Sequence, residues 1–191
     1  MNKGRLEAFS DGMIAIFITI MVLEFKVPHA SEPTALLPLL PAFFSYVLSF
    51  VFLGIYWSNH HHLLQAVKHV DGRVLWANLH LLFWLSLIPF VTAWMGENHF
   101  AAWPVALYGV ALLGSAIAYT ILTMALVKLH GSDSLLSKAM GHDFKGKISL
   151  VAYLLTIPLA FVDPWFAGAI YVAVAIMWLV PDRRIEKILA D

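Results

Sequence analysis

The sequence contains no cysteine and few charged residues, and each shortage excludes a class of protein. Without cysteine there is no disulfide framework, no thiolate metal site and no cysteine nucleophile. Charged residues make up only 13% of the chain, whereas an average soluble domain has about 25%. Twelve lysines and arginines balance twelve aspartates and glutamates, so no basic field favours nucleic acid as a partner. So few charges could not cover the surface of a soluble domain of this size.

The chain is instead rich in apolar residues, which account for 61% of its 191 positions. We divided it at clusters of charge, proline and glycine, and required about 20 apolar residues for each membrane span. This predicts an all-α membrane protein with six transmembrane helices, in a single domain over residues 1–191. The expected spans cover residues 6–27, 36–64, 74–95, 101–127, 148–162 and 164–181. We expect Pro89 and Pro158 to kink the third and fifth spans.

The first span has a competing interpretation as a signal peptide. Glu7 and Asp11 in its charged start disagree with that interpretation, as does the lack of a small-residue cleavage site. Six spans place both termini and the loops near 65–73 and 128–147 on one face, whose cations are Lys3, Arg5, Lys68, Arg73, Lys128, Lys138, Lys145, Lys147, Arg183, Arg184 and Lys187. The opposite face carries Lys26 alone, so the positive-inside rule predicts that both termini are cytoplasmic.

Polar residues are concentrated at the start of the first span, in residues 5–11. Ser10 is a candidate N-cap, with Asp11 at the positive end of the helix. Alternatively Asp11 lies inside the helix, because several apolar residues precede it, and then it needs a partner. Arg5, or a histidine from another helix, could supply that partner.

A second polar run, residues 56–62, ends the second span with three consecutive histidines. Neighbouring helical residues point about 100° apart, so the three rings cannot converge on one metal ion. We therefore expect no metal site there, and expect His60 to meet Asp11 or Ser10 across a helix interface. The isolated polar residues Asn78, His80, Thr120 and Thr123 are expected to have structural roles, through bonds within or between helices.

The first span also carries four residues on one stripe: Ile16, Thr19, Ile20 and Leu23. Their offsets of 0, 3, 4 and 7 place them on one face of a helix. From spacing alone this stripe is a packing surface. Near it, Lys26 and Glu24 either pair or set the local concentration of cations.

Two motifs resemble those of a known family. Arg5, Phe9, Ser10 and Asp11 form R-x-x-x-F-S-D at the start of a first transmembrane helix, and Trp57, Asn59 and His60 form W-x-N-H in the second. Together they resemble the transmembrane-protein-175 family of potassium channels, in particular its bacterial members. The resemblance covers the six-helix layout, although the specific motifs occupy only the first two helices.

The resemblance implies a homotetramer in the bacterial inner membrane, with the first helix of each subunit lining a central pore for K⁺ and, less readily, other monovalent cations. It implies no cofactor, and the T-V-G-Y-G filter of ordinary potassium channels is absent from the sequence. Ile16 is matched to the family's apolar constriction and Thr19 to a threonine associated with potassium preference, while Ile20 and Leu23 extend the same face. Arg5, Asp11, Trp57 and His60 are implied to hold the first helix against its neighbours.

Two other functions are compatible with parts of the sequence. A proton-coupled transporter would use Asp11 and His60 as a relay, but should show an inverted repeat and a site at the membrane midplane. A metal-dependent membrane hydrolase would need ligands clustered from several helices at one depth. The acidic residues lie mostly in loops, so we expect a channel and not an enzyme.

Overall fold

The computed structural model describes residues 2–131, 134, 136–137 and 143–179. Within these residues every regular element is helical, which confirms the all-α prediction for this part of the chain. The elements are α1 (Gly4–Ile20), η1 (Met21–Glu24), η2 (Pro33–Leu39), α2 (Leu40–Gln65), α3 (Gly72–Ser86), α4 (Ile88–Glu97), α5 (Ala102–His130), α7 (Phe144–Leu159) and α8 (Pro164–Leu179).

In the described part of the chain, four helical stretches are long and apolar enough to cross a membrane: Gly4–Glu24, Pro33–Gln65, Gly72–Glu97 and Ala102–His130. They correspond to the first four expected spans. Helices α7 and α8 have 16 residues each, or about 24 Å at 1.5 Å per residue. The expected end of the sixth span, residues 180–181, lies outside the described residues.

The two prolines expected to kink their spans have different effects. Pro89 has no N–H to donate, and its ring crowds the carbonyl four residues earlier. The third expected span therefore divides at Leu87, whose N–H reaches back only three residues to the Trp84 carbonyl, at 3.2 Å. Pro158 does not produce the expected kink, because it lies one residue before the end of α7. The helical hydrogen bonds continue past it, since the Ala160 N–H donates to the Thr156 carbonyl at 2.9 Å.

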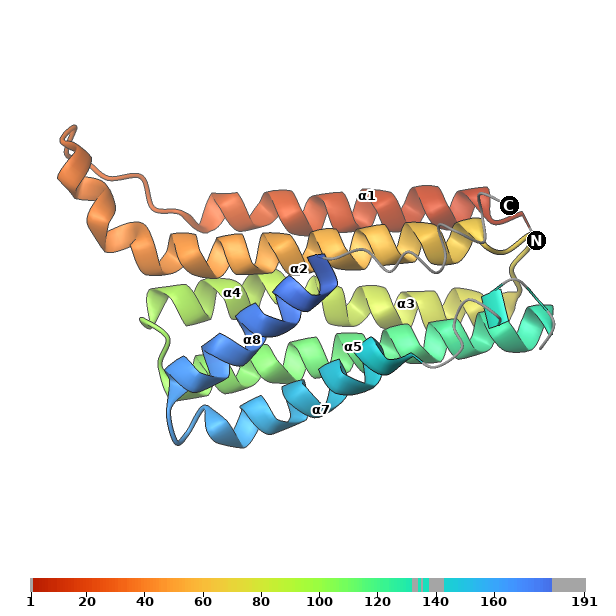
Figure 1. Ribbon diagram of the computed structural model, residues 1–191. Helices are drawn as coiled ribbons and strands as arrows, with labels where there is room; N and C mark the ends of the chain where they lie inside the picture. The colour runs from red at the N-terminus through yellow and green to blue at the C-terminus, as the bar shows by residue number, and fades with distance from the viewer. Residues whose placement is uncertain (1, 132–133, 135, 138–142, 180–191) are drawn as a thin grey trace.

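The helices form an up-and-down bundle (Figure 1), in which α1 packs on α2 and α3, and α5 packs on α3, α4 and α7. Helix α8 runs obliquely across the bundle and contacts α7, α2 and α5. Tyr108 of α5 and Tyr171 of α8 are among the largest fully buried side chains. The Tyr108 hydroxyl lies 2.9 Å from that of Ser49, which lies 2.6 Å from that of Thr92. Because Thr92 donates to the Ile88 carbonyl, it accepts from Ser49, and these three buried hydroxyls are all paired.

The two ends of the bundle differ in charge. Helices α1, α3 and α7 begin, and α2 and α5 end, at the same end of the bundle (Figure 1). The described cations of that end are Lys3, Arg5, Lys68, Arg73, Lys128, Lys145 and Lys147. Lys26 lies beyond α1, toward the opposite end. Lys138, Arg183, Arg184 and Lys187 lie outside the described residues.

Candidate functional site

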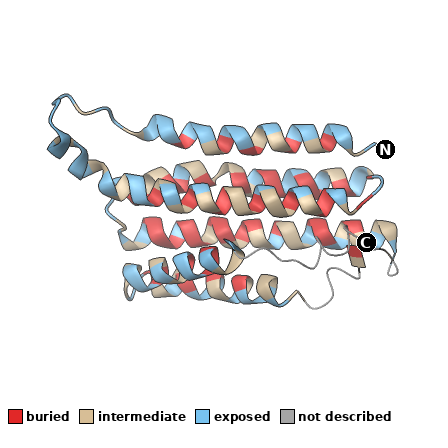
Figure 2. Ribbon diagram, turned by 45° about the horizontal axis from the view of Figure 1, so that its top comes forward, coloured by how far each residue is buried: buried red, intermediate tan, exposed pale blue. Residues whose placement is uncertain are grey.

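Helix α1 has a buried face and an exposed face (Figure 2). The buried face consists of Leu6, Ser10, Ile14 and Phe17, and Met21 continues it into η1. These residues pack against α2 and α3. Because α1 begins at Gly4 with Lys3 as its N-cap, the interpretation of Ser10 as the N-cap is wrong. Asp11 therefore lies inside the helix.

The exposed face of α1 carries Ile16, Thr19 and Ile20 of the stripe expected from the sequence. Leu23, the fourth residue of the stripe, lies beyond α1 in the 3-10 helix η1. Ile16 is 56% exposed, Ile20 44% and Leu23 79%, and Thr19 is exposed as well. No other described element of the chain covers them. Arg5 and Phe9 are also exposed, and at 100° per residue they lie within about 20° of Ile16 around the helix. The exposed face therefore extends along the whole of α1.

Thr19 is a polar residue on this face, and its hydroxyl hydrogen already takes part in a hydrogen bond within α1. The Thr19 hydroxyl donates to the Ala15 carbonyl at 2.9 Å and lies 3.2 Å from the Ile16 carbonyl. A hydroxyl has one hydrogen and two acceptor lone pairs. What Thr19 presents away from the helix is therefore an oxygen acceptor, which suits a cation and not an anion.

A buried chain of hydrogen bonds joins α1, α2 and α3. The Asn78 side-chain nitrogen donates to Ser10 Oγ at 2.9 Å, and Asn78 Oδ1 lies 2.7 Å from His60 Nε2. Since an amide oxygen only accepts, His60 Nε2 carries the proton. All three side chains are fully or almost fully buried. His60 bonds neither to Asp11 nor directly to Ser10, the two partners expected for it; Asn78 lies between His60 and Ser10 and bonds to both.

Asp11 has a different partner from the ones expected for it. Trp57 Nε1 donates to Asp11 Oδ1 at 3.0 Å, in an exposed contact between α1 and α2. The structure does not bring Arg5 and Asp11 together, and the Arg5 side chain makes no hydrogen bond or ion pair within the described residues. Six residues correspond to about 120° of rotation and 9 Å of rise, so the two side chains diverge.

The remaining polar residues of the two motif regions point in several directions. Asn59 contributes its backbone carbonyl, which accepts from the Tyr119 hydroxyl at 3.2 Å. His61 lies 2.8 Å from the Gln65 side chain and stacks on Trp57. Thr120 bonds within its own helix, as the sequence predicts. Asn78 bonds between helices, as the sequence analysis expects. That its partners are Ser10 and His60 was not predicted, because no local signal shows that three helices meet at it.

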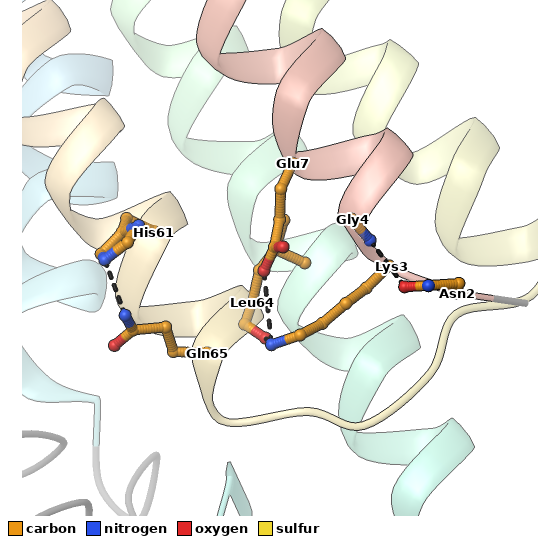
Figure 3. Close-up of polar contacts among 7 residues, drawn as sticks. All are labelled: Asn2, Lys3, Gly4, Glu7, His61, Leu64 and Gln65. Atoms are coloured by element: carbon orange, nitrogen blue, oxygen red, sulfur yellow. Dashed lines mark hydrogen bonds and ion pairs between the residues drawn. The ribbon is translucent and has the colours of Figure 1, made fainter.

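Each end of α1 is also attached to a neighbouring helix. At the start of α1, Lys3 Nζ donates to the Leu64 carbonyl of α2 at 2.7 Å and lies 3.3 Å from Glu7 Oε1 (Figure 3). Beyond its other end, Lys26 pairs with Glu97 of α4 at 2.8 Å, and not with Glu24. The hydrogen bond to the Glu97 carboxylate raises the pKa of Lys26 above its usual value.

Comparison with known proteins places the chain in a family. The family described as the endosomal/lysosomal potassium channel TMEM175 matches residues 5–89, which contain α1, α2 and α3. A potassium channel of Chryseobacterium sp. (strain P1-3) is 56% identical over 191 residues, covering 100% of both chains. A potassium channel of Streptomyces collinus is 35% identical over 178 residues, covering 85% of each chain.

A vertebrate relative carries a different name. The endosomal/lysosomal proton channel TMEM175 of Danio rerio is 25% identical over 135 residues, which are 68% of this chain and 25% of the fish protein. Among solved structures, the crystal structure of a lysosomal potassium-selective channel TMEM175 homolog from Chamaesiphon minutus matches with a TM-score of 0.80 and 29% identity, covering 94% of this chain and 97% of that one. The resemblance to this family is thereby confirmed, and the chain, a multi-pass membrane protein, belongs to the TMEM175 family of ion channels.

Proposed function

We propose that the chain forms a potassium-permeable cation channel, in which four copies surround a pore lined by the exposed face of α1. The observation that carries this proposal is the face itself, with Ile16, Thr19, Ile20 and Leu23 uncovered in the single chain. The names of the bacterial relatives and of the matched crystal structure support potassium as the permeant ion.

The buried side of α1 explains why its other side is available. The chain of hydrogen bonds through Ser10, Asn78 and His60 fixes the rotation of α1 about its own axis. With that rotation fixed, the stripe points away from the rest of the subunit. Four such faces around an axis would enclose a narrow passage, with no polar backbone exposed to lipid.

In this proposal Ile16 forms the constriction and Thr19 assists the ion next to it. Four isoleucine side chains make an apolar ring, from which water is easily expelled, so the ring can close the pore without blocking it sterically. An ion that passes loses part of its hydration shell. The outward lone pairs of the Thr19 hydroxyl, 2.9 Å from the Ala15 carbonyl, replace some of that shell.

The wider arrangement follows the sequence analysis. We propose one domain over residues 1–191, six spans per subunit, and a bacterial inner membrane with both termini in the cytoplasm. The described cations at the end where α1 begins support that orientation. The permeant species are K⁺ and, less readily, other monovalent cations, and the mechanism needs no cofactor.

The test is flux per assembled channel in liposomes, with imposed gradients of K⁺ and then of Na⁺. We expect K⁺ flux to exceed Na⁺ flux, and Ile16→Asn to raise both. A wild-type protein that is assembled but carries no K⁺ current would contradict the proposal.

A proton function is the second candidate, favoured by the name of the vertebrate relatives. The relay that the sequence suggests is not continuous in the described residues, because Asp11 bonds to Trp57 and His60 bonds to Asn78. Proton uptake measured with a pH dye, without K⁺ on either side, distinguishes the two. Uptake that is abolished by His60→Gln and insensitive to Ile16→Asn would favour the transporter.

A further inference from the structure

The end of the bundle where α1 begins holds two histidines that the channel proposal does not use. His69 lies in the connection between α2 and α3, and His130 is the last residue of α5. Their ring centres are 4.8 Å apart, with the ring planes inclined at 47°. Neither belongs to α1 or to the run of three histidines in residues 60–62. The contact therefore joins two residues, His69 and His130, that are 61 positions apart in the sequence.

The protonation of His130 is determined by its own helix. His130 Nδ1 lies 3.0 Å from the Leu126 carbonyl oxygen. A carbonyl only accepts, so Nδ1 carries the hydrogen and Nε2 has a free lone pair. His130 Nε2 is buried and has no hydrogen-bond partner among the described residues. A buried acceptor without a partner is costly, and an imidazole held through Nδ1–H to a backbone carbonyl is the usual form of a metal-binding histidine.

The separation of the two rings fits a shared metal ion. A metal bound to an imidazole nitrogen at about 2.0–2.1 Å lies about 3.2 Å from the ring centre. Two imidazoles that bind one ion at about 90–110° then have ring centres about 4.5–5.3 Å apart. The observed 4.8 Å lies within that range. Because His69 is exposed, its ring can turn a nitrogen toward the ion at little cost.

The geometry points to a site in which His69 and His130 together bind a divalent first-row transition metal ion. Imidazole ligands suit Zn²⁺, Cu²⁺ and Ni²⁺, and not Mg²⁺ or Ca²⁺. No group of three or more His, Asp and Glu side chains placed to hold a metal is present in the described part of the chain. Water therefore completes the coordination, which makes the site open and exchangeable. An ion bound there would link the loop between α2 and α3 to the C-terminal end of α5.

The test uses the untagged full chain in detergent micelles and does not depend on ion flux. Calorimetric titration with Zn²⁺ should show one ion per chain, with affinity reduced at least tenfold in His69→Gln and in His130→Gln. The matched control is His61→Gln, which removes an exposed histidine of α2 and should change the affinity less than twofold. With Cu²⁺, the electron paramagnetic resonance spectrum should lose one coordinating imidazole nitrogen in His69→Gln.

His130 is partly buried, whereas His69 is exposed, so His69→Gln is the variant that should leave the fold unchanged. Zn²⁺ should raise the melting temperature of the wild-type protein, and it should not raise that of His69→Gln. Wild-type Zn²⁺ affinity in His69→Gln, with an unchanged Cu²⁺ spectrum, would overturn the proposal and leave a contact between two tilted rings. Loss of binding in His61→Gln would overturn it also, and would assign the metal to residues 60–62.

Discussion

Helices α1 and α5 are both apolar enough to span a membrane, yet they are used in opposite ways. In an apolar 18-residue stretch of each span, 44% of the residues are buried in Ala102–His130, which is α5, and 28% in Gly4–Glu24, which is α1 with η1. Helix α5 contacts α3, α4, α7 and α8, and its buried Tyr108 hydroxyl is paired inside the bundle. Helix α1 buries one face and leaves the other uncovered. The fold of the subunit therefore depends on α5, whereas its proposed function depends on the surface that α1 leaves free.

The largest loss of stability is expected from a substitution on the buried side of α1, where it would test whether this side holds α1 in the subunit. Asn78→Ala removes the partner of both Ser10 and His60. Each buried group left unpaired costs about 1–3 kcal/mol. We expect a clear loss of thermal stability in detergent. Asn59→Ala is the matched control, because the hydrogen bond of Asn59 uses the backbone carbonyl that alanine retains. Equal melting temperatures for both variants would show that the buried chain does not hold α1.

Substitutions at one glycine in each helix compare how tightly α5 and α1 are packed. A Cβ on Gly114 of α5 would overlap the Trp84 ring, whereas a Cβ on Gly12 of α1 meets nothing within 4 Å. Gly114→Ala should therefore destabilise the subunit by about 1–3 kcal/mol through overpacking. Gly12→Ala should leave the free energy of unfolding unchanged, or raise it by up to about 1 kcal/mol through helix propensity. Chemical unfolding in micelles measures both, and a reversed order would mean that α1 is the better packed helix.

Substitution of Ile16 tests whether the exposed side of α1 lines the pore. If it lines the pore, Ile16→Ala and Ile16→Asn ease dehydration, so K⁺ and Na⁺ flux should both rise several-fold per assembled channel. If it is instead a packing residue, Ile16→Ala leaves a cavity, costs about 2–5 kcal/mol and lowers the yield of protein. Flux normalised to assembled channel separates the two, because only a pore residue raises the normalised flux.

Thr19 should affect selectivity more than stability. Valine has nearly the shape of threonine and lacks the acceptor oxygen. Thr19→Val should therefore lower the preference for K⁺ over Na⁺ by less than about tenfold, which is less than about 1.4 kcal/mol. The measurement is the reversal potential with K⁺ on one side and Na⁺ on the other. An unchanged potential would exclude Thr19 from the filter.

The smallest effect is expected at the exposed bond between Trp57 and Asp11. The indole and the carboxylate are 3.0 Å apart in an exposed contact, so Asp11→Ala should cost about 0.5–1.5 kcal/mol. A fully buried charge pair would cost about 3–5 kcal/mol. Trp57→Phe, which keeps the ring and loses the N–H, is the companion variant. A loss in the larger range would indicate that a neighbouring subunit covers this bond.

Sequence patterns predicted part of what depends on periodicity and on proline. Ile16 and Ile20 share an exposed face because α-helical spacing is regular, whereas Leu23 lies in the 3-10 helix that follows. Pro89 interrupts its span because it has no N–H to donate, but Pro158 does not kink its helix. Contacts between helices could not be predicted in the same way. Asp11 and Arg5 have opposite charges and lie close in the sequence, but their positions around α1 keep them apart. Asn78 has no charged neighbour to mark it, although it joins three helices.

The attachments at the two ends of α1 have a mechanical consequence. A helix that is held near both ends cannot pivot about either one. It can move only by bending near its middle or by rotating about its long axis. The two fastenings also differ in strength. The Lys26–Glu97 pair is exposed, with 82% and 52% of the two side chains accessible, so dissolved salt screens it. The contact of Lys3 with the Leu64 carbonyl is partly buried and is screened less. Raising the ionic strength should therefore weaken the attachment at Lys26 before the one at Lys3. Helix α1 would then be held at its N-terminal end and be able to pivot about it.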